Sequence, residues 1–370
     1  MSYYSYDAID KIDATYKMII GQRSNGKTFG WCRKVLEEYL DTGTPSAYIR
    51  RLDRQIEVKM LDGLFSPHLE WLEKKSKYKW NAIIYRSHRF YLARFETTPT
   101  GVTKKTAQDR TAFCHTYAIN TAETSKGADN GEVKYICFDE FMTRQNYLNN
   151  EFVLFQNLLS SIIRGRNNIQ IYMLANTVNK YCPYFNDMGL SRVQRQKQGT
   201  IDVYRIGETK LRIAVEYCSM METPSVQESE YYAFDNPQLK MITTGEWEIA
   251  LYRHAPPQLS DYRKILTFFI VFDGATVQGD VHMYKGFPLA FFHEKTTPIK
   301  EPEKSIIYWQ ESLDGNPLHQ IDLRVAPTKA QQLIVQLFKT QKTFFAYNDI
   351  GETVNNWMKF SMQNRIRAHI

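Results

Sequence analysis

The first half of the chain alternates between two patterns of apolar positions. Short apolar runs, typical of buried strands, cover residues 16–20, 46–51, 112–119, 133–139 and 169–177. Longer stretches with apolar residues at helical spacing cover residues 27–40 and 150–163. Strands that alternate with helices predict an α/β domain built on a mostly parallel sheet.

The second half follows a different pattern. Apolar strands are predicted over residues 264–272, 277–284 and 288–293, separated by the turn signals Asp273-Gly274 and Lys285-Gly286. Consecutive strands with glycine turns favour an antiparallel meander. Two helices are expected to follow, one capped by Thr328 and one over residues 354–362. A smaller α+β domain is therefore predicted after the first domain.

The region between the halves predicts the domain boundary. Residues 200–217 are typical of a β-hairpin, and residues 220–237 are rich in Glu, Ser, Pro and Tyr with little periodicity. We predict a first domain over residues 1–205, a hairpin and linker region over 206–245, and a second domain over 246–370.

Residues 21–28 match the phosphate-binding pattern G-x-x-x-x-G-K-[ST] at every fixed position. The loop lies between a predicted strand and a predicted helix, where its backbone N–H groups and the helix N-terminus can bind phosphate oxygens. Lys27 is expected to reach the β- and γ-phosphates of ATP, and Thr28 to ligate Mg²⁺. The predicted nucleotide-binding residues are Gly21, Gln22, Arg23, Ser24, Asn25, Gly26, Lys27 and Thr28.

A second motif follows about a hundred residues later, where an apolar strand ends in Asp139-Glu140. Asp139 is predicted to hold Mg²⁺ and Glu140 to polarise the attacking water. The strand over 169–177 ends near Asn176, which is a candidate sensor of the γ-phosphate; the alternative is that Asn176 begins a turn. A small-molecule kinase or a GTPase explains this set less well, because kinases lack a dedicated water-activating glutamate and no guanine-specifying N-K-x-D occurs.

Arg164 and Arg166 lie in the turn after the predicted helix 150–163. One interpretation is an arginine finger, because charge that develops on the γ-phosphoryl group needs a planar cation supplied by a neighbouring subunit. The other is a helix C-terminus stabilised by basic residues. The residues alone leave both open.

The composition of the chain limits the kinds of partner and the compartment that we expect. The 370 residues carry a net charge of +7, which favours a polyanionic partner. The five cysteines are widely spaced and form no metal-binding or disulfide pattern. The first residues do not form a secretory signal, and no window of 18 apolar residues occurs. We therefore expect a cytosolic protein with no membrane partner.

Several of these segments together resemble the DNA-packaging (encapsidation) ATPases of small, short-tailed, protein-primed phages of the Picovirinae type, which are related to terminase large subunits. The segments are Gly21-x-Arg23-x-x-Gly26-Lys27-Thr28, Tyr48-Ile49-Arg50-Arg51, Cys137-Phe138-Asp139-Glu140-Phe141, Ile163-Arg164-Gly165-Arg166 and Leu174-Ala175-Asn176.

The resemblance implies an ASCE-type P-loop ATPase domain joined to an RNase H-like domain. It also implies a homopentameric ring on the portal of a prohead in the host cytoplasm, where ATP drives double-stranded DNA of any sequence into the capsid. By the same resemblance Arg164 is the finger in trans, Arg166 is its fallback, and Lys126 lies in a loop that faces the neighbouring subunit.

The resemblance further implies a second domain without nuclease activity, although four acids are available there: Asp273, Asp280, Glu294 and Asp322. The alternatives are a terminase-like enzyme with a nuclease, a helicase-like ATPase, and a binding protein switched by ATP. The sequence leaves open the stoichiometry of the ring, the need for a packaging RNA, and which basic residues grip DNA. Arg54 and Lys59 are candidates for the grip by charge and position alone.

Overall fold

The structure is a computed structural model that describes residues 3–125, 132–144, 147–178, 181–219, 247, 250–254, 262–310 and 314–363. The chain divides into two compact units, Met1–Trp247 and Glu248–Ile370, and each is described by itself.

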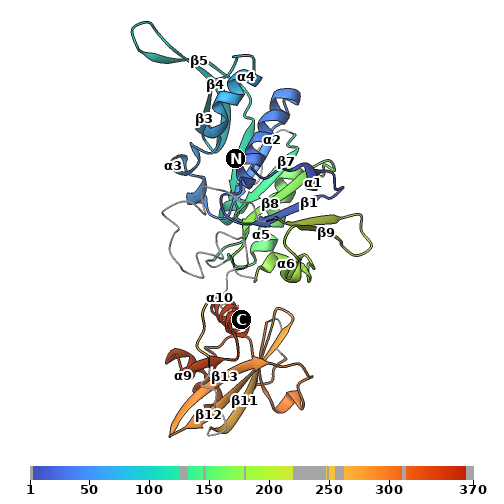
Figure 1. Cartoon of the computed structure of the whole chain (residues 1–370), viewed down its shortest axis with the longest axis vertical. Coiled ribbons are helices and arrows are strands. Elements are labelled where there is room, and N and C mark those ends of the chain that lie inside the picture. The colour runs from blue at the N-terminus through green and yellow to red at the C-terminus, as the bar shows by residue number, and fades with distance from the viewer. Residues whose placement is uncertain are drawn as a thin grey trace. The chain divides into compact units, whose positions relative to one another are not determined.

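The first unit is built on a ten-stranded sheet (Figure 1). Six neighbouring strands run parallel, in the order β6 (Cys114–Ala118), β2 (Ser46–Arg50), β7 (Tyr135–Asp139), β8 (Gln170–Asn176), β1 (Tyr16–Gly21) and β10 (Arg212–Tyr217). At one edge β9 (Thr200–Arg205) pairs antiparallel with β10. At the other edge β4 (Arg89–Thr97) pairs antiparallel with β6, and β3 (Ala82–Arg86) and β5 (Thr103–Gln108) both pair with β4. The predicted mostly parallel α/β sheet is confirmed.

The two predicted long helices cover opposite faces of this sheet. On one face α2 (Lys27–Thr42) packs Trp31, Val35 and Leu36 against Ile19 of β1. On the other face α5 (Glu151–Ile163) packs Phe155 and Leu158 against Met18 of β1. Adjacent residues of one strand thus face two cores, which explains why the parallel strands read as continuous apolar runs.

The other helices among the described residues of the first unit are short. They are α1 (Asp7–Asp10), α3 (Val58–Leu61), α4 (Leu69–Lys75) and α6 (Pro183–Asp187), with 3₁₀ helices at Asp53–Ile56, Ser66–His68, Ile119–Ser125 and Val193–Arg195.

The hairpin at residues 200–217 forms as predicted, but it belongs to the main sheet. β10 pairs in parallel with β1, from Tyr16 opposite Ile213 to Ile20 opposite Tyr217. A boundary after residue 205 therefore cuts the hairpin from the sheet that it completes. The reason lies in a pairing between segments about two hundred residues apart, which the local pattern does not reveal.

The described part of the second unit has a six-stranded sheet and two α-helices. β11 (Arg263–Phe272), β12 (Ala275–Tyr284) and β13 (Phe287–Glu294) form the predicted antiparallel meander. On the far side of β11, β14 (Ile306–Trp309) and β15 (His319–Gln320) add in parallel, and β16 (Thr343–Phe345) joins β13. The order β13-β12-β11-β14-β15 matches the predicted RNase H-like arrangement.

The helices of the second unit are α9 (Lys329–Lys339) and α10 (Asn348–Gln363), and a short 3₁₀ helix spans Pro302–Lys304. Thr328 caps α9 as predicted, because its hydroxyl accepts the backbone N–H of Gln331. The buried Trp357 of α10 packs against Tyr308 and Phe338, with ring centroids 5.1 and 6.0 Å apart. The helices therefore cover one face of this sheet.

Candidate nucleotide-binding and hydrolysis site

The loop at residues 21–28 joins β1 to α2 at the carboxyl end of the central strands. Gly26 caps α2 in a left-handed conformation with φ 90°, which glycine adopts without strain. Gln22 and Asn25 are buried, whereas Arg23 and Ser24 are exposed. The loop therefore presents its backbone and Lys27 at the start of a helix, where phosphate oxygens bind.

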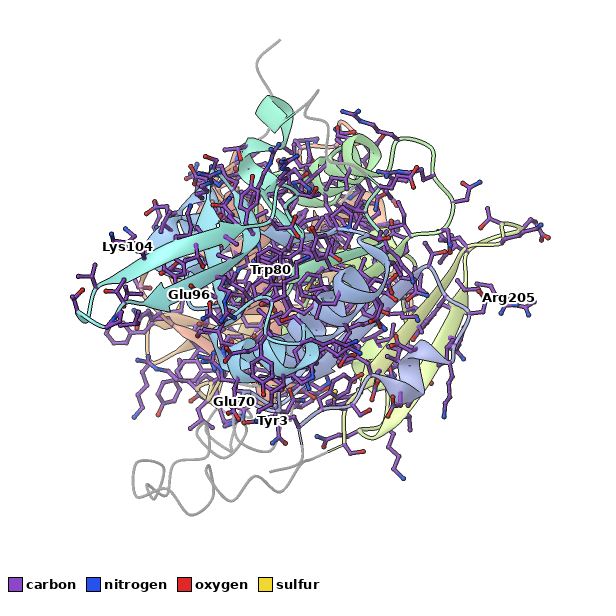
Figure 2. All side chains as sticks on the ribbon, turned by 90° about the horizontal axis from the view of Figure 1, so that it is seen from above. Tyr3, Glu70, Trp80, Glu96, Lys104 and Arg205 are labelled. Atoms are coloured by element: carbon purple, nitrogen blue, oxygen red, sulfur yellow. The ribbon has the colours of Figure 1, made fainter. Side chains whose placement is uncertain are left out.

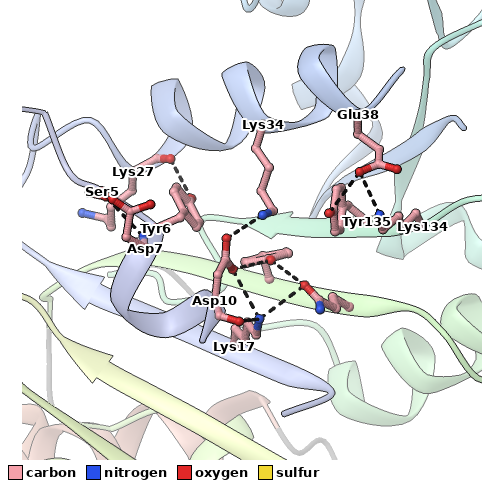
Figure 3. Close-up of polar contacts among 12 residues, drawn as sticks. Ser5, Tyr6, Asp7, Asp10, Lys17, Lys27, Lys34, Glu38, Lys134 and Tyr135 are labelled. Atoms are coloured by element: carbon pink, nitrogen blue, oxygen red, sulfur yellow. Dashed lines mark hydrogen bonds and ion pairs between the residues drawn. The ribbon is translucent and has the colours of Figure 1, made fainter. Parts of the chain in front are cut away.

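The segment before β1 packs against this loop. The backbone N–H of Tyr4 donates to the carbonyl of Asn25 (2.8 Å), and the Tyr6 hydroxyl donates to the carbonyl of Lys27 (2.8 Å). The ring of Tyr3 stacks on Phe29, with centroids 4.6 Å apart. Figure 3 shows Tyr6 beneath α2, with Asp10 bonded to Lys34 of the same helix. The loop is therefore fixed from the N-terminal side as well as by β1.

Lys27 is buried, and its ammonium donates to neutral oxygens. Its Nζ bonds the carbonyl of Gln22 (2.8 Å) and the side-chain oxygens of Asn25 (3.0 Å) and Asn176 (3.2 Å). Burial lowers the pKa of Lys27 to about 8. A buried ammonium bonded to neutral groups is stabilised further by an anion, and the phosphates of a nucleotide fit that need.

Thr28 and Asp139 meet across the site. The Thr28 hydroxyl lies 3.3 and 3.2 Å from the two carboxylate oxygens of Asp139, which ends β7. The Tyr48 hydroxyl, from β2, donates to Asp139 at 2.6 Å. Hydroxyl and carboxylate oxygens are hard ligands, and one or two carboxylates together with substrate phosphates suffice for Mg²⁺. The donor set therefore fits a magnesium ion shared with the nucleotide.

Glu140 follows Asp139 in a left-handed conformation with φ 57°, and its side chain is 54% exposed. Arg50, at the end of β2, donates from Nη2 to the Glu140 carboxylate at 2.5 Å and from Nη1 to Asp139 at 3.4 Å. The carboxylate of Glu140 is thus held in an ion pair. Arg50 thereby fixes the position of the Glu140 side chain beside Asp139.

The side chain of Arg51 bonds the backbone of the loop that carries Glu140. Its Nη1 and Nη2 donate to the carbonyls of Glu140 (3.1 Å) and Phe141 (2.6 Å), and its Nε donates to Glu151 at 2.8 Å. Glu151 is buried at the start of α5 and also accepts the Tyr184 hydroxyl (2.9 Å). The ion pair therefore joins the loop of Glu140 to the N-terminus of α5.

A cavity of about 310 Å³ adjoins this loop. Arg23, Glu140 and Asn176 line it, together with Arg51, Gln55 and Arg144. Asn176 ends β8, which lies between β1 and β7, and bonds Lys27 as described above. The structure therefore brings Lys27, Thr28, Asp139, Glu140 and Asn176 together at the carboxyl ends of the central strands.

Arg164 and Arg166 do not reach the site of their own chain. Arg164 ends α5, which is about 20 Å long and begins at Glu151 beside the loop of Glu140. Arg164 is exposed, and its Nε donates to the carbonyl of Ser161 (3.3 Å). Arg166 donates to the carbonyls of Ile162 (2.6 Å) and Ile163 (2.9 Å), as a residue that caps the helix does. Lys126 lies outside the described residues.

The four acids of the second unit have separate partners. Asp280 accepts bonds from Thr267 (2.6 Å) and Gln278 (3.1 Å) and pairs with His293 (3.3 Å). Asp322 bonds Arg324, Glu294 accepts the Tyr347 hydroxyl, and the backbone of Asp273 donates to Gln310. Within the described residues there is no group of three or more His, Cys, Asp or Glu side chains that could hold a metal ion.

Four residues of the site have no role that the sequence alone predicts. They are Tyr48, Arg50, Arg51 and Glu151, which contact the site because β2 lies beside β7 and because Arg51 pairs with Glu151 at the start of α5. The basic end of the strand at residues 46–51 is the one available signal, since side chains at the carboxyl end of a parallel strand face the ligand.

The fold and the site together define the architecture of an ASCE-type P-loop ATPase, in which an additional strand, here β8, separates the strand of the phosphate loop from the strand of the Asp-Glu pair. The second unit adds an RNase H-like sheet. None of the described helices is long and apolar enough to span a membrane.

The same two-part architecture occurs in solved structures of viral packaging motors. The structure described as the Phi-28 gp11 DNA packaging motor aligns over 100% of this chain and 99% of its own, with 15% identity and a TM-score of 0.54. The bacteriophage Phi-29 viral genome packaging motor assembly aligns over 97% of this chain and 100% of its own, with 16% identity and a TM-score of 0.57. No family model matches the sequence, and no curated protein matches it either.

Proposed function

We propose that this protein is the ATPase of a viral DNA-packaging motor, which uses ATP hydrolysis to drive double-stranded DNA into a prohead. One observation carries the proposal: Thr28 of the phosphate loop lies 3.2 Å from Asp139, and Glu140 follows beside a cavity. Nucleotide, metal and water-activating groups are then within one site. The likeness to the two packaging motors supports the fold on which the site is built.

In this proposal each residue has a distinct role. Lys27 and the loop N–H groups bind the phosphates of ATP, and Thr28 and Asp139 hold Mg²⁺. Bound Mg²⁺ neutralises charge that develops on the phosphoryl oxygens. Asn176 bonds Lys27 and faces the same cavity, which suits a sensor of the γ-phosphate. Glu140 takes the proton of the attacking water once Arg50 has released it.

Arg164 and Arg166 lie at the far end of α5 from the site of their own chain. We propose that Arg164 completes the site of a neighbouring subunit in a homo-oligomeric ring, taken as a pentamer. The side chains of both residues bond their own helix, but Arg164 is exposed and Arg166 is half-buried, so Arg164 is taken as the finger and Arg166 as its fallback. Lys126 is retained as a candidate on the neighbouring face.

The ring is proposed to act on the portal of a prohead in the host cytoplasm, with or without a packaging RNA. Its contact with DNA is expected to be independent of sequence, because a motor has to pass any genome. The second unit is proposed to serve in binding and to have no nuclease activity; in support, Asp280 pairs with His293 and Asp322 with Arg324.

The test is ATP turnover by the purified protein with and without long duplex DNA. DNA should raise turnover of the wild type. Glu140→Gln should lower it by about 10²- to 10⁴-fold while ATP binding is retained, and Lys27→Ala should lose binding. Nuclease activity on the same DNA would favour a terminase-like enzyme. Binding of ATP without any hydrolysis would overturn the proposal in favour of an ATP-switched binding protein.

A further inference from the structure

The positive charge of the protein is concentrated in one segment. Residues 77–110 contain eight Lys or Arg and two Asp or Glu, an excess of six positive charges, whereas the whole chain has a net charge of +7. This segment contains β3, β4 and β5, which together we call the basic arm (residues 77–110). The remaining residues of the chain are therefore close to neutral.

The basic arm extends beyond the parallel sheet. β4 pairs with β6 only through Arg89 opposite His115 and Phe90 opposite Cys114, at the amino end of β6. From there β4 continues past the sheet with only β3 and β5 beside it, and the β4–β5 hairpin projects from the unit (Figure 1). The phosphate loop lies at the carboxyl ends of the parallel strands. The β4–β5 end of the arm thus projects from the opposite end of these strands, away from the nucleotide site, whereas the β3–β4 turn lies beside the middle of β6.

The cations of the arm face solvent. All six residues of β5 are exposed or half-buried, Lys104 and Lys105 among the exposed ones. Arg86 stands directly opposite Arg89 in the β3–β4 pair, an arrangement of like charges that destabilises an isolated hairpin. The guanidinium of Arg86 lies 5.3 Å from the ring centroid of Tyr91, which holds it on the sheet surface.

The acids of the arm do not neutralise it. Glu96 pairs with Arg94 at 2.9 Å, and Asp109 accepts the hydroxyl of Tyr39 at 3.1 Å. The charge of Lys104, Lys105, Arg86 and Arg89 therefore remains available to a polyanion. The basic side chains are spread along the strands of a projecting hairpin. Such a spacing suits the repeated phosphates of a nucleic-acid backbone better than a compact cluster of acidic groups.

We propose that the basic arm binds the phosphate backbone of duplex DNA, as a contact separate from the ATP-driven grip. This inference rests on the proposed function, which supplies the DNA. The arm lies away from Lys27, Asp139 and Glu140, so its loss should weaken DNA binding and leave DNA-independent hydrolysis unchanged.

The experiment compares two hairpins of the same sheet. Lys104→Gln/Lys105→Gln removes two exposed charges from the arm, and Arg205→Gln/Lys210→Gln removes two exposed charges from the β9–β10 hairpin at the other sheet edge. Figure 2 shows Lys104 and Arg205 on opposite sides of the molecule in that view. Binding of a labelled DNA duplex of about 30 base pairs is titrated from about 50 to 300 mM salt, and ATP turnover is measured without DNA.

The arm variant should bind DNA between about tenfold and a hundredfold more weakly at about 0.1 M salt. Affinity should also depend less steeply on salt. The magnitude of the slope of log affinity against log salt should decrease by about 1.8, or about 0.9 for each phosphate that is no longer neutralised. The control variant should keep the slope of the wild type, and both should hydrolyse ATP at the wild-type basal rate. Arg86→Gln/Arg89→Gln provides a second arm variant that alters a different strand pair.

Three outcomes would overturn the inference. They are an arm variant with the affinity and slope of the wild type, an equally weakened affinity in the control hairpin, and a weakened affinity confined to a duplex RNA of the same length. If the wild type itself neither binds DNA nor hydrolyses ATP, the proposed function fails instead, so the two failures are distinguishable.

Discussion

Lys27 is a buried ammonium that donates its hydrogen bonds to backbone and amide oxygens. With a pKa of about 8 in the free protein, it loses its proton above pH 8, whereas bound phosphates hold the proton on. Binding above pH 8 must then take up a proton. We expect the Kd for a non-hydrolysable ATP analogue to rise as pH rises above 8, approaching about tenfold per pH unit.

The measurement is calorimetric titration between about pH 7 and pH 9.5, in buffers of different ionisation enthalpy, which also reports proton uptake. Lys27→Arg is the matched control, because its guanidinium stays charged and should give a flat profile. A flat profile for the wild type, with no proton uptake, would mean that Lys27 stays charged without a nucleotide.

Among single residues, the sequence predicts those that belong to short local motifs. Lys27, Thr28, Asp139 and Glu140 lie within short patterns at strand ends, and the structure brings them to one edge of the sheet. The side chain that holds Glu140 was not predicted, because the bond between Arg50 and Glu140 depends on two strands far apart in sequence lying side by side.

At the scale of elements, the Arg51–Glu151 pair joins the loop of Glu140 to α5. Both side chains are buried, so Glu151→Gln leaves an uncompensated charge and should lower the free energy of unfolding by about 3–5 kcal/mol. Arg51→Met/Glu151→Leu removes both charges and should lose less stability than the single variant. Its turnover should still fall by at least about tenfold, because the Glu140 loop is no longer anchored.

Urea unfolding and steady-state kinetics with ATP separate these effects, and ATP affinity should stay within about twofold for the double variant. If the single and double variants lose the same stability, the unpaired buried charge of Arg51 is not the cause of the loss in Glu151→Gln. Unchanged turnover in the double variant would show that the loop holds its position without Arg51.

Elements are predictable where burial is reflected in the local sequence. β1, β7 and β8 are apolar on both sides and were predicted within two residues of their bounds. β5 was not predicted, because Thr-Lys-Lys-Thr-Ala-Gln carries no apolar face and becomes a strand only through pairing with β4. β15 and β16 are two and three residues long and carry too little pattern to predict.

At the scale of the whole molecule, an arginine supplied in trans can be tested by mixing two inactive variants. Arg164→Ala and Lys27→Ala should each be nearly inactive alone. Mixed in equal amounts before assembly, they should recover part of the wild-type turnover, because some interfaces then pair an intact Arg164 with an intact phosphate loop. Recovery should be absent when both changes are in the same chain.

No recovery in the mixture, under conditions where both variants assemble, would place Arg164 outside the neighbour's site. Arg166→Ala is the matched comparison, since its guanidinium bonds the last carbonyls of α5. We expect Arg166→Ala to lower stability more than it lowers turnover.

The tyrosines before β1 also bear on how the protein is handled at the bench. Tyr4 and Tyr6 bond the loop and the start of α2, and Tyr3 stacks on Phe29 directly after Thr28. A purification tag or cloning scar joined ahead of Tyr3 is therefore attached close to the loop at residues 21–28. We therefore expect ATP turnover to differ between a protein extended ahead of Tyr3 and one from which the extension has been cleaved.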